Sequence, residues 1–316
     1  MSRPGQQDRP TLSDRSVLIT GGAGFIGSHI ADRLVESCQV TVLDNLSSGS
    51  REYVPAEAEL IKADIRDESA LKDALQGVDT VFHQAALVSV TESVERPIES
   101  HEINLDATLK LLELAPDSAD ILLASSTAIY GEPTSLPVDE AEPKAPASPY
   151  GLDKLSADHF FRLYHQLYDL NTTALRYFNV YGPRQRSGQY GGVISIFVDQ
   201  ALSGEPITVH GDGTQTRDFV HVDDIVDANI RAAKATTGGE AFNIGTGTEV
   251  SILELAETVR EMVDVDVEIT HESARSGDID RSRSDISKAK RELDFSPTVA
   301  LEDGIERLIE YRKARL

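Results

Sequence analysis

A tyrosine and a lysine, four residues apart, are the side chains in this sequence whose spacing most suggests catalysis. They lie in Ser148-Pro-Tyr-Gly-Leu-Asp-Lys154, where serine suits a helix N-cap and proline the first helical position. Tyr150 and Lys154 would then share one face of a helix. A nearby ammonium group favours phenolate and lowers the tyrosine pKa from about 10 toward neutral pH. The pair is therefore predicted to supply a general base.

Hydroxyl side chains end an apolar run that precedes this helix. The segment Leu123-Ala-Ser-Ser-Thr-Ala-Ile-Tyr-Gly131 is typical of a buried strand followed by a turn. A hydroxyl at such a strand end can hydrogen-bond a reacting alcohol or carbonyl, but serine and threonine serve turns equally well. The spacing leaves Ser125, Ser126 and Thr127 as alternatives for this role.

A glycine-rich turn near the N-terminus predicts where a phosphate group would bind. It follows the apolar run Ser16–Thr20 and leads into a helical pattern. Gly21, Gly24 and Gly27 would let the backbone turn tightly and bring N–H groups against a pyrophosphate at a helix N-terminus. The strand before the turn and the helix after it make the pattern more specific than the glycines alone.

Asp44 ends the next apolar run, Val40–Asp44, and lies twenty residues after Gly24. A carboxylate at this distance can bind both hydroxyls of an adenine ribose and would repel a 2′-phosphate. The nearest following arginine is Arg51, too far along to favour a phosphorylated ribose. The sequence therefore predicts NAD, rather than NADP, as cofactor.

The elements that must position these groups alternate between apolar runs and amphipathic stretches. Such alternation predicts an α/β protein with a Rossmann-type, doubly wound parallel sheet. The expected strands are 17–20, 40–44, 60–63, 80–83, 121–125 and 173–178, and the expected helices between them include 26–36, 69–75, 100–114 and 149–168.

The composition of the chain changes after about residue 181, where Gly, Pro, Gln and Arg cluster. Later helices are expected over 193–202, 223–235, 251–262 and 301–312, mixed with short strands. We expect a disordered tail over 1–13, an NAD-binding Rossmann domain over 14–180 and a smaller mixed α/β substrate-binding lobe over 181–316. A segment near 236–246, including Ala241–Ile244, is expected to return to the main sheet.

Composition narrows the class of partner. The chain has 30 basic and 53 acidic residues, a net charge of −23, which argues against nucleic acid or an anionic membrane. Because the acidic residues are scattered, we hypothesise a halophilic source. Cys38 is the only cysteine, which excludes disulfide frameworks and thiolate zinc sites. We expect a cytoplasmic protein without a membrane span, since no run of about eighteen apolar residues occurs. No metal is expected, because no HExxH motif or similar cluster is present.

Seven motifs together resemble the extended short-chain dehydrogenase/reductase superfamily, specifically its nucleotide-sugar epimerases of the UDP-glucose (UDP-galactose) 4-epimerase type. The resemblance runs from about Val17 to the last expected helix, nearly the whole chain. The motifs are Gly21-Gly-Ala-Gly-Phe-Ile-Gly27, Ala63-Asp-Ile65, His83-Gln-Ala-Ala86, Ser125-Ser126, Tyr150 with Lys154, Arg176-Tyr-Phe-Asn179 and Gly211-Asp-Gly-Thr-Gln-Thr-Arg-Asp218.

The resemblance implies epimerisation of a UDP-sugar through a transient 4-keto sugar, with tightly bound NAD recycled in each turnover. It implies Ser126 as the catalytic hydroxyl, Tyr150 as the base and Lys154 as its partner. The cofactor residues that it implies are Gly21, Gly24, Phe25, Ile26, Gly27, Asp44, Asn45, Asp64, Ile65, Gln84, Ala85, Ala86, Val88, Asn104, Tyr150, Lys154 and Phe178. The substrate residues that it implies are Ser126, Asn179, Arg217, Arg275, Asp278 and Ser282.

Related activities remain as alternatives. Dehydratases of the superfamily carry Asp-Glu directly after the catalytic hydroxyl, and decarboxylases carry a glutamate two places after it. This chain has Thr127-Ala128 there, which favours epimerisation. A non-catalytic NAD-binding sensor or scaffold is a more distant alternative, because the Tyr150–Lys154 pair is intact. Arg217 could also form a mere surface salt bridge with Asp218.

The resemblance also implies which sugars could bind and which oligomeric state to expect. Ser282 matches a position that sets pocket size, and a small side chain there allows UDP-GlcNAc/GalNAc besides UDP-glucose/galactose, with a uronic acid left open. Family members commonly form two-fold dimers through the helix of Tyr150 and the one before it, here Ser100–Leu114. Apolar side chains that would permit such a homodimer are Phe160, Phe161, Leu163 and Leu167.

Overall fold

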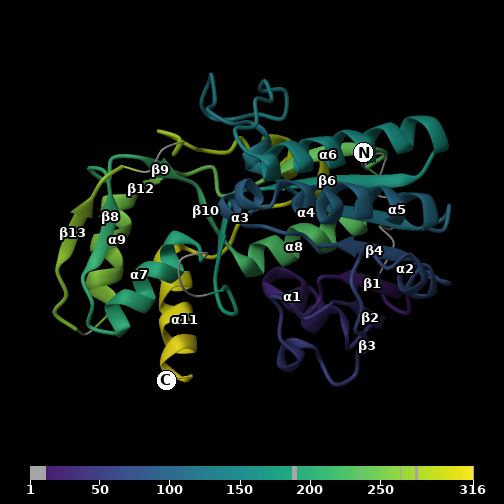
Figure 1. Cartoon of the computed structure of the whole chain (residues 1–316), viewed down its shortest axis with the longest axis horizontal. Helices are drawn as coiled ribbons and strands as arrows, with labels where there is room; N and C mark the ends of the chain where they lie inside the picture. Colours follow the sequence, from purple (N-terminus) through teal and green to yellow (C-terminus); the bar gives the residue numbers. More distant parts are fainter. Residues whose placement is uncertain (1–11, 187–190, 236, 264, 275–276, 316) are drawn as a thin grey trace, which may run out of the picture.

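The structure is a computed structural model that describes residues 12–186, 191–235, 237–263, 265–274 and 277–315. Its largest element is a seven-stranded sheet, in the order β11-β6-β5-β4-β1-β2-β3, in which every pair of neighbours is parallel (Figure 1). The strand order reverses between β1 and β4, the point at which open α/β sheets form a ligand crevice. The predicted Rossmann-type α/β fold is confirmed. The strands are β1 (Ser16–Thr20), β2 (Gln39–Leu43), β3 (Glu59–Ile61), β4 (Thr80–His83), β5 (Asp120–Ser126), β6 (Asn171–Tyr177) and β11 (Glu240–Ile244).

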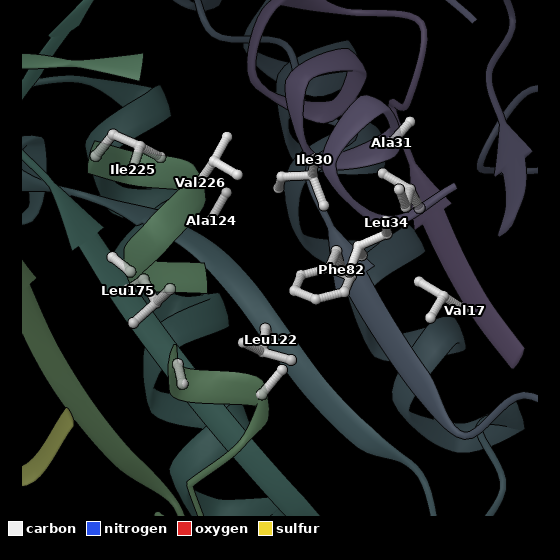
Figure 2. Packing of buried hydrophobic residues seen from close by; sticks show 14 of the residues in the cluster. Val17, Ile30, Ala31, Leu34, Phe82, Leu122, Ala124, Leu175, Ile225 and Val226 are labelled. Carbon is white, nitrogen blue, oxygen red and sulfur yellow. The ribbon is translucent and has the colours of Figure 1, made fainter. Parts of the chain in front are cut away.

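Both faces of the sheet are apolar, because alternate residues of one strand enter different cores. In β5, Leu122 packs toward one face and Ile121 toward the other. Figure 2 shows the first core, where Ile30 and Leu34 of α1 and Ile225 of α8 pack against one face of the sheet. The first core is covered by α1 (Phe25–Leu34), α8 (Val222–Ala233) and α10 (Ser287–Leu293), and the second by α2 (Glu68–Ala74), α5 (Ala107–Leu114) and α6 (Pro149–Tyr168).

The smaller lobe lies on the left in Figure 1 and has a core of its own. Phe197, Leu255 and Leu308, from three different helices, are fully buried in it. Its helices are α7 (Val193–Leu202), α9 (Ile252–Met262) and α11 (Leu301–Lys313), and its strands β8 (Ile207–His210) and β13 (Ile269–Glu272) pair in parallel. Two further strand pairs connect it to the main domain, β7 (Asn179–Tyr181) with β10 (Phe219–His221) and β9 (Thr216–Arg217) with β12 (Val250–Ser251).

The domain division differs from the expected cut at residue 181. The segment near 236–246 does return to the main sheet, where β11 pairs with β6. However, α8 before it and α10 after it also pack in the main core, through Ile225 and Leu293. The reason is that β11 covers the free edge of β6, and α8 covers apolar residues that helices from the first half leave exposed. The smaller lobe therefore excludes residues 222–244 and 286–295.

Two further boundaries differ from expectation. Leu12 is buried and accepts a hydrogen bond from Cys38 Sγ, so the expected tail over 1–13 extends too far. The helix expected over 100–114 begins earlier, since Pro97 starts α4 (Pro97–His101) after a separate helix α3 (Val90–Glu95). One π-helical turn, η2 (Glu102–Asp106), then separates α4 from α5. None of the helices in the described ranges has the length and apolar content to cross a membrane.

Candidate active site

The tyrosine and the lysine lie in the first turns of α6, at the carboxyl ends of the central strands. Ser148 caps the helix, its Oγ accepting from Gly151 N at 3.1 Å, so the helix begins at Pro149 as predicted. Lys154 is 3% exposed, and its Nζ donates to the carbonyl oxygen of Ala124 in β5 at 2.8 Å. The same Nζ lies 6.0 Å from the centre of the Tyr150 ring.

Ser126 joins this pair from the end of β5. Its side chain hydrogen-bonds the phenol of Tyr150, and its Oγ accepts from Ala128 N at 3.1 Å in the short helix η3 (Thr127–Ile129). Ser125 points the other way: its Oγ donates to Asp158 Oδ2 at 3.0 Å in the core. Of the three hydroxyls that the spacing left open, Ser126 is therefore the one that the described contacts place against the tyrosine.

The electrostatics of the pair differ from the sequence-based expectation. Burial raises the pKa of the Tyr150 phenol, against the opposing effect of the Ser126 hydrogen bond. Burial also lowers the pKa of Lys154 to about 8, although the nearby charge of Asp153 acts in the opposite direction. The expected lowering of the tyrosine pKa is not found in the chain alone, because burial of the phenol outweighs the effect of the Ser126 hydrogen bond. Ionising Tyr150 requires a further positive charge in the cleft.

The glycine turn has the shape expected of a phosphate cradle. Gly24 is the N-cap of α1, no side chain caps the first turn, and that turn holds no acidic residue. The backbone N–H groups there are free to meet an anion at the positive end of the helix. Gly21 has φ of +68°, and a Cβ on it would lie 2.7 Å from Ala85 N. A Cβ on Gly27 would overlap the carbonyl oxygen of Gly21, so side chains are excluded from both positions.

Asp44 lies beside this turn. It is 8% exposed, and its Oδ2 accepts from Ala23 N at 3.0 Å while Oδ1 accepts from Leu46 N at 2.8 Å. The carboxylate therefore joins the end of β2 to the glycine turn. Asn45 follows it and donates to Asp64 Oδ2 at 3.0 Å.

Asp64 and Ile65 lie at the end of β3. The guanidinium of Arg66 bonds both oxygens of Asp64 and holds the pKa of that carboxyl well below its usual range. Ile65 is buried against the second core. The contacts of Asn45, Asp64 and Arg66 form a polar cluster in the loops that follow β2 and β3.

The loop after β4, residues 84–88, faces the glycine turn, with Ala85 touching Gly21. Val88, at the end of the loop, is 67% exposed. Asn104, expected in the cofactor pocket, is itself buried; its amide accepts from Leu87 N at 2.9 Å and donates to Leu87 O at 3.0 Å. Asn104 therefore holds this loop in place. Phe178 is also buried, in a small apolar cluster with Ile129, Tyr130 and Val138.

A buried histidine at the end of β4 has a hydrogen-bonding role, as its place at a strand end in the motif His83-Gln-Ala-Ala86 indicates. His83 is 2% exposed and lies between Thr20 Oγ1 (2.7 Å) and Thr108 Oγ1 (2.8 Å). Burial lowers the pKa of His83 to about 3, so the ring is neutral at physiological pH. Behind the loop, Tyr177 OH accepts from Asn229 Nδ2 at 2.8 Å. Strand-end polar residues of motifs such as His83-Gln-Ala-Ala86 were the available signal for these contacts.

Four predicted substrate residues gather where the lobe meets the main domain, around β7 and β9. Arg217 is 8% exposed and forms an ion pair with Asp278. Ser282 N donates to Thr216 O at 3.1 Å, next to Arg217, and its buried Oγ has no hydrogen-bond partner among the described residues. Asn179 N donates to Asp218 O at 3.0 Å. Arg275 lies outside the described residues.

The alternative of an Arg217–Asp218 surface salt bridge is wrong. Asp218 is fully buried and faces away, its oxygens accepting from Thr246 N at 2.8 Å and from Ser284 N at 3.0 Å. Within the described ranges, no group of three or more His, Cys, Asp or Glu residues is placed to hold a metal ion.

Comparison with known proteins extends these observations. Residues 17–245 match the model of the NAD dependent epimerase/dehydratase family. The chain is 42% identical to a putative UDP-glucose 4-epimerase of Methanocaldococcus jannaschii, over 94% of this chain and 98% of that protein. It is 34% identical to a UDP-N-acetyl-alpha-D-glucosaminuronate decarboxylase of Bacillus cytotoxicus, over 93% of this chain and 96% of that protein. The crystal structure of UDP-glucose 4-epimerase with UDP-glucose from Thermotoga maritima superimposes with a TM-score of 0.91 at 38% identity, covering 95% of this chain and 99% of that one.

Proposed function

The chain belongs to the NAD-dependent epimerase/dehydratase family, and on that premise we propose that it is a UDP-sugar 4-epimerase acting on UDP-glucose and UDP-galactose. The observation that carries the proposal is the meeting of Ser126, Tyr150 and Lys154 at the same carboxyl edge of the sheet as an uncapped glycine turn. The uncapped turn, the excluded side chains at Gly21 and Gly27 and the carboxylate of Asp44 fit NAD. NAD is accordingly the cofactor.

The chemistry divides between the cofactor and three side chains. Bound NAD supplies reversible hydride transfer at C4 of the sugar, which makes a transient 4-keto sugar and restores a hydroxyl on either face. Tyr150 accepts the proton of the 4-hydroxyl as a general base and returns it after the sugar has turned. Ser126, bonded to that phenol, orients the reacting oxygen. Lys154 lies 6.0 Å from the Tyr150 ring, and the positive nicotinamide of bound NAD would add the further charge that the buried phenol needs in order to ionise.

The residues after Ser126 support epimerisation over its nearest alternatives. Elimination of water or loss of carbon dioxide would need an acidic group next to the reacting carbon. Thr127 and Ala128 stand there instead and begin η3. Identity is also higher to the epimerase of M. jannaschii than to the decarboxylase of B. cytotoxicus. Decarboxylase or dehydratase activity is therefore the weaker proposal, and a non-catalytic NAD-binding role is weaker still.

Two residues of the smaller lobe support a nucleotide-diphosphate sugar as substrate. Arg217 places a buried guanidinium at the interface, and an anionic diphosphate in a protein of charge −23 needs such a local cation. Asp278 holds the guanidinium in place until the ligand binds. Ser282 presents a small buried side chain with a hydroxyl that is free to bond, so UDP-GlcNAc and UDP-GalNAc also fit the proposed pocket.

A direct assay tests the activity. Purified protein is incubated separately with UDP-galactose, UDP-GalNAc and UDP-glucuronic acid, without added NAD, and the nucleotide sugars are separated by chromatography. We expect interconversion of UDP-galactose and UDP-glucose with NAD retained on the protein. Bound NAD without conversion of any UDP-sugar would refute the epimerase. Release of carbon dioxide from the uronic acid would replace it with a decarboxylase.

We also propose a homodimer through α6 and the short helices beside it. Leu152 and Leu167 of α6 are 55% and 61% exposed, and Ile98 of α4 is 75% exposed. Helices α3 and α4 both pack against α6, so these side chains belong to one side of the domain. Phe161, expected at the interface, is instead fully buried in the core. Sedimentation of Leu167→Glu tests the proposal: the wild type should be a dimer and the variant a monomer.

The cytoplasmic location stays a prediction, to be checked by fractionating the source cells and assaying each fraction for the epimerase.

A further inference from the structure

A half-buried tyrosine in the loop after β2 is contacted by arginines from two distant segments. Tyr53 ends the short helix η1 (Arg51–Tyr53). The guanidinium of Arg184, in the segment after β7, lies over its ring at 5.3 Å from the ring centre. That of Arg315, which follows α11, lies over the same ring at 5.6 Å, and Tyr311 OH donates to Tyr53 OH at 3.1 Å. A guanidinium at this distance is attracted to the face of an aromatic ring.

The loop that carries Tyr53 is attached to the features that we assign to NAD. Ser50 N donates to the carbonyl oxygen of Ala23 in the glycine turn at 2.9 Å. Gly49 packs so closely on the same turn that a Cβ on it would lie 2.6 Å from that oxygen. The loop also begins directly after Asp44, whose carboxylate bonds Ala23 N. A displacement of this loop would therefore disturb both the glycine turn and Asp44.

The segment after β7 holds α1, the helix that begins at the glycine turn. Arg184 forms an ion pair with Asp32 of α1 at 2.7 Å. His29 Nε2 of α1 lies 3.0 Å from the carbonyl oxygen of Pro183, to which it must donate. Arg184 has a φ of +67°, a left-handed backbone that is unfavourable for residues other than glycine and persists only where surrounding contacts enforce it. Its side chain thus contacts α1 and Tyr53 at once.

Helix α11 brings the smaller lobe to the same place. Leu308 of this helix is buried in the core of the lobe, and Arg312 Nη2 donates to the carbonyl oxygen of Gln185 at 2.8 Å. Arg315 also pairs with Glu52 of η1 at 3.3 Å. The smaller lobe is thereby joined to the loop after β2 by contacts that surround one aromatic side chain.

Ion pairs alone would hold these parts together weakly. The pairs of Arg184 with Asp32 and of Arg315 with Glu52 join partly exposed side chains, and such pairs contribute little and are screened by salt. Two guanidinium groups over a half-buried ring gain more, because the ring displaces water from them. The face of the Tyr53 ring is therefore the contact on which the attachment depends most.

This attachment has a functional reason, because a cofactor that is recycled in each turnover must stay bound between turnovers. Resting on NAD as the cofactor of the proposed epimerase, we propose that Tyr53 is a positioning residue that retains NAD, by holding the smaller lobe against the loop at the glycine turn. It acts through residues 45–54 and through α1. The proposal requires that the face of the ring is needed, and not only its bulk.

The rate of NAD release tests the proposal without any UDP-sugar. Protein loaded with NAD is diluted into buffer with ethanol and excess alcohol dehydrogenase, which reduces NAD only after it has left the protein, and NADH fluorescence reports the rate. Tyr53→Leu keeps the bulk and removes the aromatic face, so NAD should leave about tenfold faster than from the wild type. Tyr53→Phe keeps the face and loses only the hydroxyl contact with Tyr311, so its rate should stay close to that of the wild type.

Two outcomes would overturn the role of the ring. A Tyr53→Leu protein that releases NAD no faster than Tyr53→Phe would show that the aromatic face is not needed. With excess NAD, kcat for UDP-galactose should be the same in Tyr53→Leu as in the wild type, because the role concerns retention and not the chemical step. A loss of kcat that excess NAD does not restore would show general damage to the fold instead.

Arg315→Ala tests the same contact from the side of the lobe. Arg315 is exposed and follows α11, so its loss leaves both cores intact, while one of the two guanidinium groups over Tyr53 is gone. NAD release should be accelerated. Arg291→Ala is the matched control, since it removes an exposed arginine that pairs with its neighbour Glu292 on α10, and its release rate should equal that of the wild type. Equal rates in the two arginine variants would remove α11 from the attachment and overturn the proposal.

The two proposals fail separately. A wild type that retains NAD but converts no UDP-sugar refutes the epimerase, and the release rates still decide the role of Tyr53. Equal release from the wild type and Tyr53→Leu, with UDP-galactose still converted, refutes the role of Tyr53 alone.

Discussion

At the end of β5, the proposed catalytic side chains are held within one strand–helix unit. The smaller lobe instead holds its candidate substrate residues with partners from distant segments. Ser126, Tyr150 and Lys154 all lie in β5 and the first turns of α6, and Lys154 bonds back to β5. Arg217, in contrast, forms an ion pair with Asp278, which lies sixty-one residues later in the sequence. The catalytic corner is therefore fixed by local structure, and the lobe by tertiary pairing. Substitutions in the two regions should fail in different ways.

The largest effect should come from the catalytic corner. Tyr150→Phe keeps the ring and removes the proton acceptor, so kcat for UDP-galactose should fall by ~10²–10⁴-fold with NAD still bound. Tyr164→Phe, on the same helix with its hydroxyl on Glu113, is the matched control and should keep its rate. Near-full activity in Tyr150→Phe would contradict the proposed base.

The second-largest effect should come from the glycine turn, where a substitution should weaken NAD binding rather than slow the chemical step. In Gly27→Ala the new methyl group would overlap the carbonyl of Gly21, and overpacking of this kind weakens binding by roughly tenfold or more. NAD released from denatured protein measures the occupancy. Gly77→Ala is the control: it shares a positive φ with Gly21 but has no atom within 4 Å of its Cβ. Equal NAD content in both variants would argue against the cradle.

Substitutions in the smaller lobe should change the specificity for the sugar more than the rate of turnover. Ser282→Tyr would fill the proposed sugar pocket, and kcat/KM for UDP-GalNAc should fall about tenfold further than kcat/KM for UDP-galactose. Ser282→Ala removes only the hydroxyl and should keep the ratio between the two sugars. Equal loss for both sugars in the tyrosine variant would remove Ser282 from the specificity of the site.

The smallest effect is that of salt on thermal stability, and it concerns both regions together. With a net charge of −23, the folded protein repels itself at low salt, and the Debye length falls from ~10 Å at 0.1 M to ~3 Å at 1 M. The melting temperature should therefore rise with KCl, as for a halophilic protein, and calorimetry should show one transition if the two cores unfold together. Unchanged stability would contradict the halophilic hypothesis, and two transitions would show that the lobe unfolds separately.

Sequence could predict the local parts of this structure. Helix α6 occupies the predicted residues Pro149–Tyr168, because Ser148 and Pro149 are strong start signals. The glycine turn and Asp44 adjoin as expected, since strand, turn and helix follow one another in the chain.

The remainder depends on long-range contacts that leave no local pattern. The ion pair of Arg217 with Asp278 and the bonds of Asn104 to Leu87 each join separate elements. The raised pKa of Tyr150 was missed for the same reason: spacing gives the neighbour four residues away, but not the burial around it.

The late return of the chain to the main sheet has a consequence for biosynthesis. During synthesis on the ribosome, β6 emerges long before β11. The apolar surface that α8 and α10 cover stays exposed until residues 222–293 have been made. Until then the nascent chain presents an open strand edge, the kind of surface that aggregates or recruits chaperones. A fragment ending at residue 180 should therefore be insoluble when expressed alone, although it contains all three catalytic side chains. Cofactor loading should likewise be a post-translational event.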